Sequence, residues 1–434
     1  MALLLENVRA IDPSMGLDEI TNIAIKDGKI VAIGSDITIE KGERRDLTGK
    51  IALPGLVDMH VHLREPGQEY KEDIESGGRA AAYGGFSAVL AMPNTSPVIS
   101  DGSLVAHLLD KAQQVSKTRV HVAGAVTRNL KGESLSEMGD MFMSGAVAFT
   151  DDGRGVQDSG LLRLAFDYAK QFGVPILSHC QDEALAGGGV VNEGEVSTRL
   201  GLAGWPAVAE ELPIARDIAL AELTGCAVHI QHISTARGVE LVRDAKERGL
   251  PVTCEVTPHH LFLCEEDLDT NYNTSLKMNP PLRTRSDNLA LQAALAEGII
   301  DCIASDHAPH AAHEKALEFE LAPFGTTGLE TSLALILDQL VSNGLLSYAQ
   351  LVERMAHAPR RILGLEPVFL GLGSTADITI IDEDLFWTAG SDGWQSKSTN
   401  SAFEGRELCG KATDVYVGGF ASLQDGEVVR KIHA

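Results

Sequence analysis

The chain has 434 residues, and its hydrophobic content of 44% and charged content of 22% are those of an ordinary globular protein that can bury a large core. Its 61 acidic residues outnumber its 36 basic ones, and the formal charge of −25 argues against a nucleic-acid partner or an anionic membrane surface. An anionic substrate would therefore need a local cluster of cationic side chains.

The cysteines and the chain start indicate the compartment. The six cysteines contain no C-x-x-C pair, and Met1 is followed within a few residues by Glu6, unlike a secretory signal. No apolar run reaches the ~18 residues that span a bilayer. We therefore expect a cytoplasmic protein whose thiols are reduced and packed as small apolar side chains.

Both ends of the chain have the pattern of short strands joined by turns. Residues 23–25 and 30–33 flank Asp27-Gly28, which is a strong hairpin signal. Three further strands are expected near the C-terminus, at residues 377–381, 415–417 and 427–429. We expect a small β-sandwich domain assembled from both termini, with residues 1–53 as its first part and 369–434 as its second.

The middle of the chain, residues 54–368, alternates helices with short apolar strands. Four helical patterns end at a glycine, which tolerates the left-handed turn of a helix end: Gly173, Gly225, Gly249 and Gly298. Eight strands are expected, near residues 57–62, 86–92, 119–126, 146–150, 174–179, 227–232, 252–256 and 300–306. This α/β alternation favours a (β/α)8 TIM-like barrel over an open doubly wound sheet, because no G-x-G-x-x-G turn follows the first strand.

Histidine and aspartate residues stand at the carboxyl ends of these strands, where barrel enzymes place their active sites. His60 and His62 project to the same side of the first strand because side chains alternate along a strand. The later strand ends carry Asp151, Asp152, His179, His232 and Asp306. A lone histidine is more often a hydrogen-bonded core residue, but four histidines and two acids on one rim favour a shared metal site.

The ligand set mixes imidazole and carboxylate without thiolate, which suits Zn²⁺, with Mn²⁺, Co²⁺ or Fe²⁺ as alternatives. Four histidines and one bridging carboxylate suffice for two ions, one on His60 and His62 and the other on His179 and His232. Two such ions, ~3.5–4 Å apart, share a hydroxide and lower its pKa towards ~7. We expect one or two Zn²⁺ per subunit, with two favoured. Spacing alone does not choose between Asp151 and Asp152 as the bridge.

Two stretches, His60-Val61-His62-Leu63-Arg64-Glu65-Pro66-Gly67 and Ala304-Ser305-Asp306-His307-Ala308-Pro309-His310, resemble the signatures of the dihydroorotase family of the amidohydrolase superfamily. Residues 92–95, 150–153 and 277–283 are similar to internal motifs of that family, so the resemblance covers nearly the whole chain. It implies reversible hydrolysis and cyclisation between (S)-dihydroorotate and N-carbamoyl-L-aspartate in pyrimidine biosynthesis.

The resemblance also implies a role for each site residue. The metal would be held by His60, His62, Asp152, His179, His232 and Asp306, and Asp306 would also carry the proton as general base and then general acid. The substrate would be held by His62, Arg64, Asn94, Asn279, His310, Phe324 and Gly325. Many superfamily members bridge their metals with a carboxylated lysine, whereas residues 149–153 offer only aspartate, as in the bacterial dihydroorotase branch.

Arg64 is the residue that bears most on specificity, because its planar fork can grip a carboxylate at the strand end. Allantoinases and dihydropyrimidinases resemble the same stretch with a different residue there, and remain the alternative enzymes. A third alternative is a non-catalytic barrel that acts as a scaffold for aspartate carbamoyltransferase. We expect a small-molecule substrate and a homodimer, and a complex with aspartate carbamoyltransferase is compatible with activity.

Overall fold

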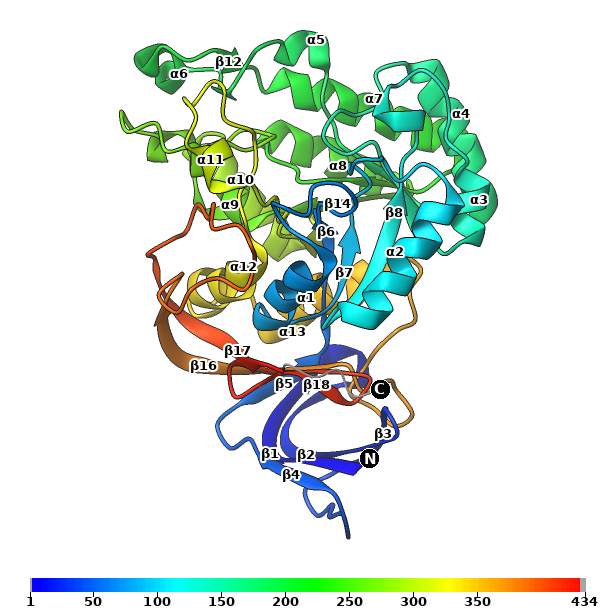
Figure 1. The fold of residues 1–434 in the computed structure, drawn as a ribbon, viewed down its shortest axis with the longest axis vertical. Helices are drawn as coiled ribbons and strands as arrows, with labels where there is room; N and C mark the ends of the chain where they lie inside the picture. The colour runs from blue at the N-terminus through cyan, green and yellow to red at the C-terminus, as the bar shows by residue number, and fades with distance from the viewer. Residues whose placement is uncertain (1, 430–434) are drawn as a thin grey trace.

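Two sheets organise the chain, one closed into a barrel and one built from both chain ends. The computed structural model describes residues 2–429. The barrel and its helices occupy the upper part of Figure 1, and the sheet of the two termini lies beneath them. The expected fold class, a TIM-like barrel joined to a β domain from both termini, is confirmed.

The barrel consists of eight parallel strands whose order around the sheet follows the chain. They are β6 (Leu56–Val61), β7 (Phe86–Ala91), β8 (Arg119–Gly124), β9 (Ala148–Phe149), β10 (Ile176–Ser178), β13 (Val228–Ile230), β14 (Val252–Val256) and β15 (Cys302–Ile303). Since β15 is short, the barrel closes just beyond it, where Val61 of β6 pairs in parallel with His307. The backbone N–H of His62 donates to the carbonyl of His307 at 2.9 Å.

Long helices follow most barrel strands and cover the outside of the barrel (Figure 1). They are α1 (Ile74–Tyr83), α2 (Gly102–Val115), α4 (Ser159–Ala169), α7 (Val208–Thr224), α8 (Ala236–Glu247), α10 (Arg285–Glu297) and α12 (Leu329–Ile336). Gly225 and Gly298 end α7 and α10 in the left-handed conformation, at φ 70° and 89°, as their sequence positions predicted.

Shorter elements fill the connections. The helices are α3 (Met138–Met143), α5 (Glu183–Ala186), α6 (Glu195–Leu200), α9 (Pro258–Phe262), α11 (Ala312–Lys315), α13 (Tyr348–Val352) and α14 (Ala358–Ile362). Single turns are η1 (Pro13–Met15), η2 (Arg128–Leu130), η3 (Lys170–Phe172), η4 (Glu265–Asp267), η5 (Thr274–Leu276), η6 (Leu337–Val341) and η7 (Glu353–His357). A two-stranded sheet pairs β11 (Val191–Asn192) with β12 (Gly204–Trp205).

The sheet of the two termini has nine strands in the order β19-β18-β17-β16-β5-β1-β2-β3, with β4 paired to β1. They are β1 (Ala2–Asp12), β2 (Leu17–Lys26), β3 (Lys29–Ile33), β4 (Glu43–Asp46), β5 (Ile51–Pro54), β16 (Ile378–Thr388), β17 (Glu407–Val417), β18 (Phe420–Gln424) and β19 (Glu427–Val428). The strands from the two chain ends meet where β5 pairs with β16. Only Gly55 separates β5 from β6, so the chain passes directly from this sheet into the barrel.

Two further expectations concern the cysteines and the membrane. All six cysteines are free, as expected; five of them are buried, whereas Cys409 is only partly buried. Within residues 2–429, none of the helices combines the length and hydrophobicity that crossing a bilayer requires.

Candidate metal centre

A cavity of about 330 Å³ opens at the carboxyl ends of the barrel strands, and it collects the residues that the sequence singled out. Eleven of them line it: His62, Arg64, Asn94, Asp152, His179, His232, Asn279, Asp306, His310, Phe324 and Gly325. His60 is fully buried and contacts His62 and His232. The structure therefore brings all twelve predicted site residues into one place, although they are spread over some 266 positions of the sequence.

Asp152 lies at the centre of the four histidines. Its Oδ1 lies 3.4 Å from His60 Nε2, 3.5 Å from His179 Nδ1 and 3.7 Å from His232 Nε2. Its Oδ2 lies 3.5 Å from His62 Nε2. One carboxylate thus faces all four imidazoles, which is the arrangement that a bridging ligand requires.

Asp151, the neighbouring acid, faces a different part of the structure. Its carboxylate accepts a hydrogen bond from the Thr127 backbone N–H at 2.9 Å and another from the Thr127 hydroxyl. Burial raises the pKa of Asp151 to about 6. The geometry therefore separates two adjacent acids that spacing left equivalent, because only Asp152 contacts the histidines.

The donor atoms form two overlapping clusters that could hold a metal ion. One contains His60, Asp152 and His232, and the other contains His60, His62 and Asp306, with the donor atoms of each within 4.8 Å of one another. His60 Nε2 is buried and makes no hydrogen bond within residues 2–429. An unpaired buried polar atom costs about 1–3 kcal/mol, so a ligand that occupies it is favoured. Imidazole and carboxylate donors fit Zn²⁺.

Asp306 borders this centre on the side of β6. Its Oδ1 lies 3.0 Å from His62 Nε2 and 3.4 Å from His60 Nε2. Burial acts to raise the pKa of Asp306, but His60 and His62 hold it below its ordinary range, so the carboxylate is ionised.

Backbone strain is concentrated at the same site. Arg64, His232 and Asp306 have φ values of 60°, 32° and 47°, a region that residues other than glycine rarely adopt. Each such residue costs about 1–3 kcal/mol and persists only where its surroundings enforce it. The fold therefore stabilises an otherwise unfavourable backbone in order to aim these three side chains into the cavity.

Glu255 is a site residue that the sequence reasoning missed. Its Oε1 lies 2.6 Å from His60 Nδ1 and its Oε2 lies 3.2 Å from His229 Nε2. It also accepts a hydrogen bond from the backbone N–H of His232 at 3.3 Å. Burial acts to raise the pKa of Glu255, but His60 and His229 together outweigh it and the pKa falls to about 2. The available signal was a single acid within the short strand β14, whose sequence is VTCEV.

The substrate side of the cavity carries cationic groups. Arg64 donates through Nε to the Pro309 carbonyl at 3.1 Å, and its Nη2 lies 3.3 Å from His310 Nε2. Burial lowers the pKa of His310 to about 2, with Arg64, Lys71 and Lys315 acting in the same direction, so the ring is neutral. Of these groups, Arg64 lines the cavity itself and supplies the positive charge that an anionic substrate needs in an acidic protein.

Two asparagines also line the cavity, with different surroundings. Asn94 is engaged with the metal centre, since its Oδ1 lies 2.9 Å from His62 Nδ1 and its Nδ2 donates to Asp152 Oδ2 at 3.2 Å. Asn279 donates through Nδ2 to Gln181 at 2.9 Å, but its Oδ1 is buried and has no partner within residues 2–429. Asn279 therefore offers a bound molecule an unused acceptor for an N–H group.

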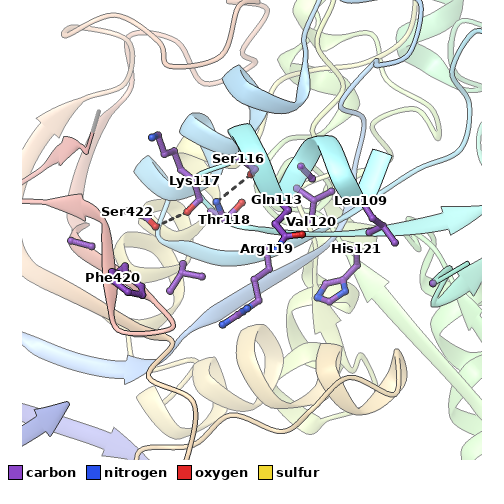
Figure 2. A pocket seen from close by; sticks show the side chains of 14 residues that line it. Leu109, Gln113, Ser116, Lys117, Thr118, Arg119, Val120, His121, Phe420 and Ser422 are labelled. Carbon is purple, nitrogen blue, oxygen red and sulfur yellow. Dashed lines mark hydrogen bonds between the residues drawn. The ribbon is translucent and has the colours of Figure 1, made fainter. Parts of the chain in front are cut away.

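A second cavity, of about 490 Å³, lies at the amino end of β8 between α2 and the strands β17 and β18 (Figure 2). Its arginine, Arg119, is paired with Asp377 through two hydrogen bonds of 3.0 and 3.1 Å. The hydroxyl of Ser422 donates to the Lys117 carbonyl, as Figure 2 shows. Neither metal-ligand cluster found within residues 2–429 lies here, so the cavity at the opposite end of the strands is the candidate active site.

Known proteins are similar to this chain in sequence and in structure. The family model described as "Dihydro-orotase-like" matches residues 49–238. The dihydroorotase of Pelobacter propionicus is 49% identical over 96% of this chain and 99% of its own length, and that of Pelotomaculum thermopropionicum is 48% identical over 98% and 99%. The solved L-hydantoinase (dihydropyrimidinase) of Arthrobacter aurescens superposes with a TM-score of 0.88 at 28% identity, over 98% of this chain and 97% of that one.

Proposed function

The chain belongs to the dihydroorotase family, a family of metal-dependent enzymes that hydrolyse a cyclic amide, and from this premise we propose how the residues of the cavity divide the work. The reaction is the reversible ring opening of (S)-dihydroorotate to N-carbamoyl-L-aspartate in pyrimidine biosynthesis. The observation that carries the proposal is the convergence of four imidazoles on Asp152, with Asp306 beside them.

We propose that the metal centre holds Zn²⁺, with two ions per subunit favoured over one. His60 and His62 would hold one ion and His179 and His232 the other, with Asp152 between them and Asp306 at the edge. The unpaired His60 Nε2 and the absence of thiolate from the donor set support this assignment. When bound, the metal supplies a hydroxide nucleophile at neutral pH and polarises the ring carbonyl.

Asp306 would carry the proton of the reaction. As an ionised carboxylate it takes the proton of the attacking hydroxide while the new carbon–oxygen bond forms at the ring carbonyl. It then returns that proton to the ring nitrogen as the carbon–nitrogen bond breaks, and the product gains a carboxylate. Cyclisation uses the same groups in reverse.

Arg64 and His310 would bind the substrate carboxylate, with Asn94 beside them at the metal edge. Arg64 Nη2 and His310 Nε2 are neighbouring nitrogens that border the cavity, so one carboxylate could accept from Arg64 and, in place of the Phe324 carbonyl, from His310. Asn279 would accept a hydrogen bond from a ring N–H through its unused Oδ1. Of the Phe324-Gly325 backbone, the Phe324 carbonyl is the group that faces His310, at 2.8 Å.

Substrate comparison tests this function directly. Purified, zinc-loaded protein is expected to turn over dihydroorotate at least about 100-fold faster than dihydrouracil or allantoin, because buried cations left without a carboxylate are costly. The Asp306→Asn variant is expected to retain its metal and lose turnover. Near-wild-type turnover in that variant, with metal retained, would remove the proton role from Asp306.

Location, assembly and domain limits are also part of the proposal. A cytoplasmic location is supported by six free cysteines. A homodimer and a complex with aspartate carbamoyltransferase rest on family membership alone, and gel filtration of the protein with and without that enzyme tests both. The division at residues 53 and 368 can be tested by expressing 54–368 separately and measuring whether it folds.

A further inference from the structure

One wall of the active-site cavity has no regular secondary structure. Residues 316–325 follow α11 without forming a helix or a strand, and Pro323, Phe324 and Gly325 line the cavity. Backbone carbonyls in an irregular segment have no helix or sheet partner, so those that face the protein interior need hydrogen-bond donors from elsewhere. The source of those donors determines the shape of this wall.

Lys277 supplies three of the donors from one buried ammonium group. Its Nζ donates to the carbonyls of Phe319, Glu320 and Ala322 at 2.8, 2.9 and 2.7 Å. An ammonium has three N–H donors, so all three are used. The side chain is only 2% exposed, and such burial is tolerated because every donor is satisfied.

Other side chains hold three more carbonyls of the same segment. Lys315 donates to the Pro323 carbonyl at 2.9 Å, and Asn400 donates to that of Gly325 at 3.1 Å. The Phe324 carbonyl faces His310 Nε2 at 2.8 Å. Six of the seven carbonyls in residues 319–325 are therefore bound by side chains, and Lys277 binds half of those six.

Lys277 also connects this wall to Asn279, which lines the same cavity. The Gly325 backbone N–H donates to the Lys277 carbonyl at 2.8 Å, and the Phe324 ring lies 4.6 Å from the Lys277 ammonium, within cation–π range. Asn279, with its unused acceptor, stands two residues further along the chain. A displacement of Lys277 would therefore move both the wall and the residue proposed to contact the ring.

We propose that Lys277 is a positioning residue for the reaction, whose ammonium shapes residues 319–325 into the wall that receives the substrate ring. This inference rests on the proposed function, because the wall matters for turnover only if the ring binds in this cavity. Lys277 acts on binding through Phe324, Gly325 and His310, and it touches neither the metal donors nor Asp306 in the contacts described.

The Lys277→Met variant, compared with wild type, tests the proposal. Methionine keeps the unbranched stem of lysine and removes the three N–H donors. KM for dihydroorotate is therefore expected to rise about tenfold or more, while kcat per metal-loaded site changes little. Hydrogen–deuterium exchange is expected to accelerate in peptides covering 318–327 and to stay unchanged elsewhere. Bound zinc is expected to stay at the wild-type level.

Lys170→Met is the matched control, because Lys170 also donates to a backbone carbonyl, that of Thr224, but lies away from the cavity. It is expected to leave KM, kcat and exchange of 318–327 unchanged. If Lys277→Met does not fold, Lys315→Met takes its place, since it frees one carbonyl rather than three, and a smaller rise in KM is expected.

If KM of Lys277→Met stays within about twofold of the wild-type value, the proposal is overturned. Unchanged hydrogen–deuterium exchange of residues 318–327 in that variant also overturns it. A lower kcat with an unchanged KM also overturns it, because that pattern indicates a general loss of active enzyme. Absence of dihydroorotate turnover in the wild type would instead contradict the proposed function. The exchange comparison would still test whether Lys277 holds residues 319–325 in place.

Discussion

A carboxylate oxygen of Glu255 lies 2.6 Å from Nδ1 of His60. Because the Glu255 carboxylate is ionised, it accepts this hydrogen bond, and the proton of the imidazole sits on Nδ1. Nε2 of His60, on the other side of the ring, lies 3.4 Å from an oxygen of Asp152 and 3.4 Å from one of Asp306. The buried carboxylate of Glu255 thus fixes the ring orientation of a histidine that lies 195 positions earlier in the chain.

The Glu255→Gln variant is expected to bind metal about 10–100-fold more weakly, because an amide holds the His60 proton less strongly than a carboxylate. Competition with a chelator of known affinity measures the change. Glu330→Gln is the control, since Glu330 is also a buried glutamate but contacts the backbone of Gln395 and Ser396 instead. Equal metal affinity in the two variants would contradict the role of Glu255.

Replacing each of the two adjacent acids separately should give opposite results. Asp152→Asn is expected to weaken metal retention by more than about 100-fold, because it removes the carboxylate that faces all four histidines. Asp151→Asn is expected to retain the metal and to lose only about 1 kcal/mol of stability, since an amide oxygen can still accept from Thr127. Elemental analysis after dialysis against chelator decides between them, and metal loss in Asp151→Asn would reverse the assignment.

Arg64→Gln is expected to raise KM for dihydroorotate by about 10–100-fold, because it removes one charge-assisted hydrogen bond worth ~1.5–3 kcal/mol. Turnover of dihydrouracil, which has no carboxylate, should change far less. Steady-state kinetics on both substrates measures the ratio. Arg79→Gln serves as control because the ion pair that Arg79 makes within the described residues is with Glu75, on the same helix α1. An unchanged ratio in Arg64→Gln would exclude the carboxylate contact.

Glu330 should make stability depend on pH. Burial raises the pKa of Glu330 to about 7, above its ordinary value of 4.5. The folded state therefore holds the proton of Glu330 better than the unfolded state does. The contribution of this group to the free energy of unfolding is fully present below pH 4.5 and is lost as pH rises through about 7. Within that window the loss is about 1.4 kcal/mol per pH unit.

The side chain at position 330 stays neutral in the Glu330→Gln variant. The melting temperature of this variant should therefore fall less than that of wild type between about pH 5 and pH 8, the range in which Glu330 loses its proton. Thermal unfolding at the two pH values measures the difference. The same pH dependence in both proteins would show that Glu330 does not contribute to it.

Local sequence patterns were sufficient to predict the barrel and the residues on its rim. Glycines such as Gly225 and Gly298 end helices for a local steric reason, and the alternation of His60 and His62 follows from strand geometry. Since parallel strands of a barrel end on one rim, ligands far apart in sequence could be assigned to one place. The grouping needed no knowledge of side-chain contacts.

Contacts between distant residues could not be predicted in this way. The choice of Asp152 over Asp151 depends on how the chain turns after β9, and it came only from a family resemblance. Glu255 and Lys277 look like an acid in a strand and a cation in a loop until their partners, His60 and the carbonyls of 319–325, are known. Asn94 was expected at the substrate carboxylate, and its contacts with His62 and Asp152 depend equally on tertiary structure.

The pairing of Val61 with His307 joins the first barrel strand to the segment after the last one. His60 and His62 flank Val61 on one side of this pairing, and Asp306 precedes His307 on the other. This group of donors therefore comes together only after the barrel has closed. A nascent chain that ends before residue 306 cannot assemble it, however well its earlier strands have formed. Metal binding at this group of donors therefore depends on the part of the barrel that is synthesised last.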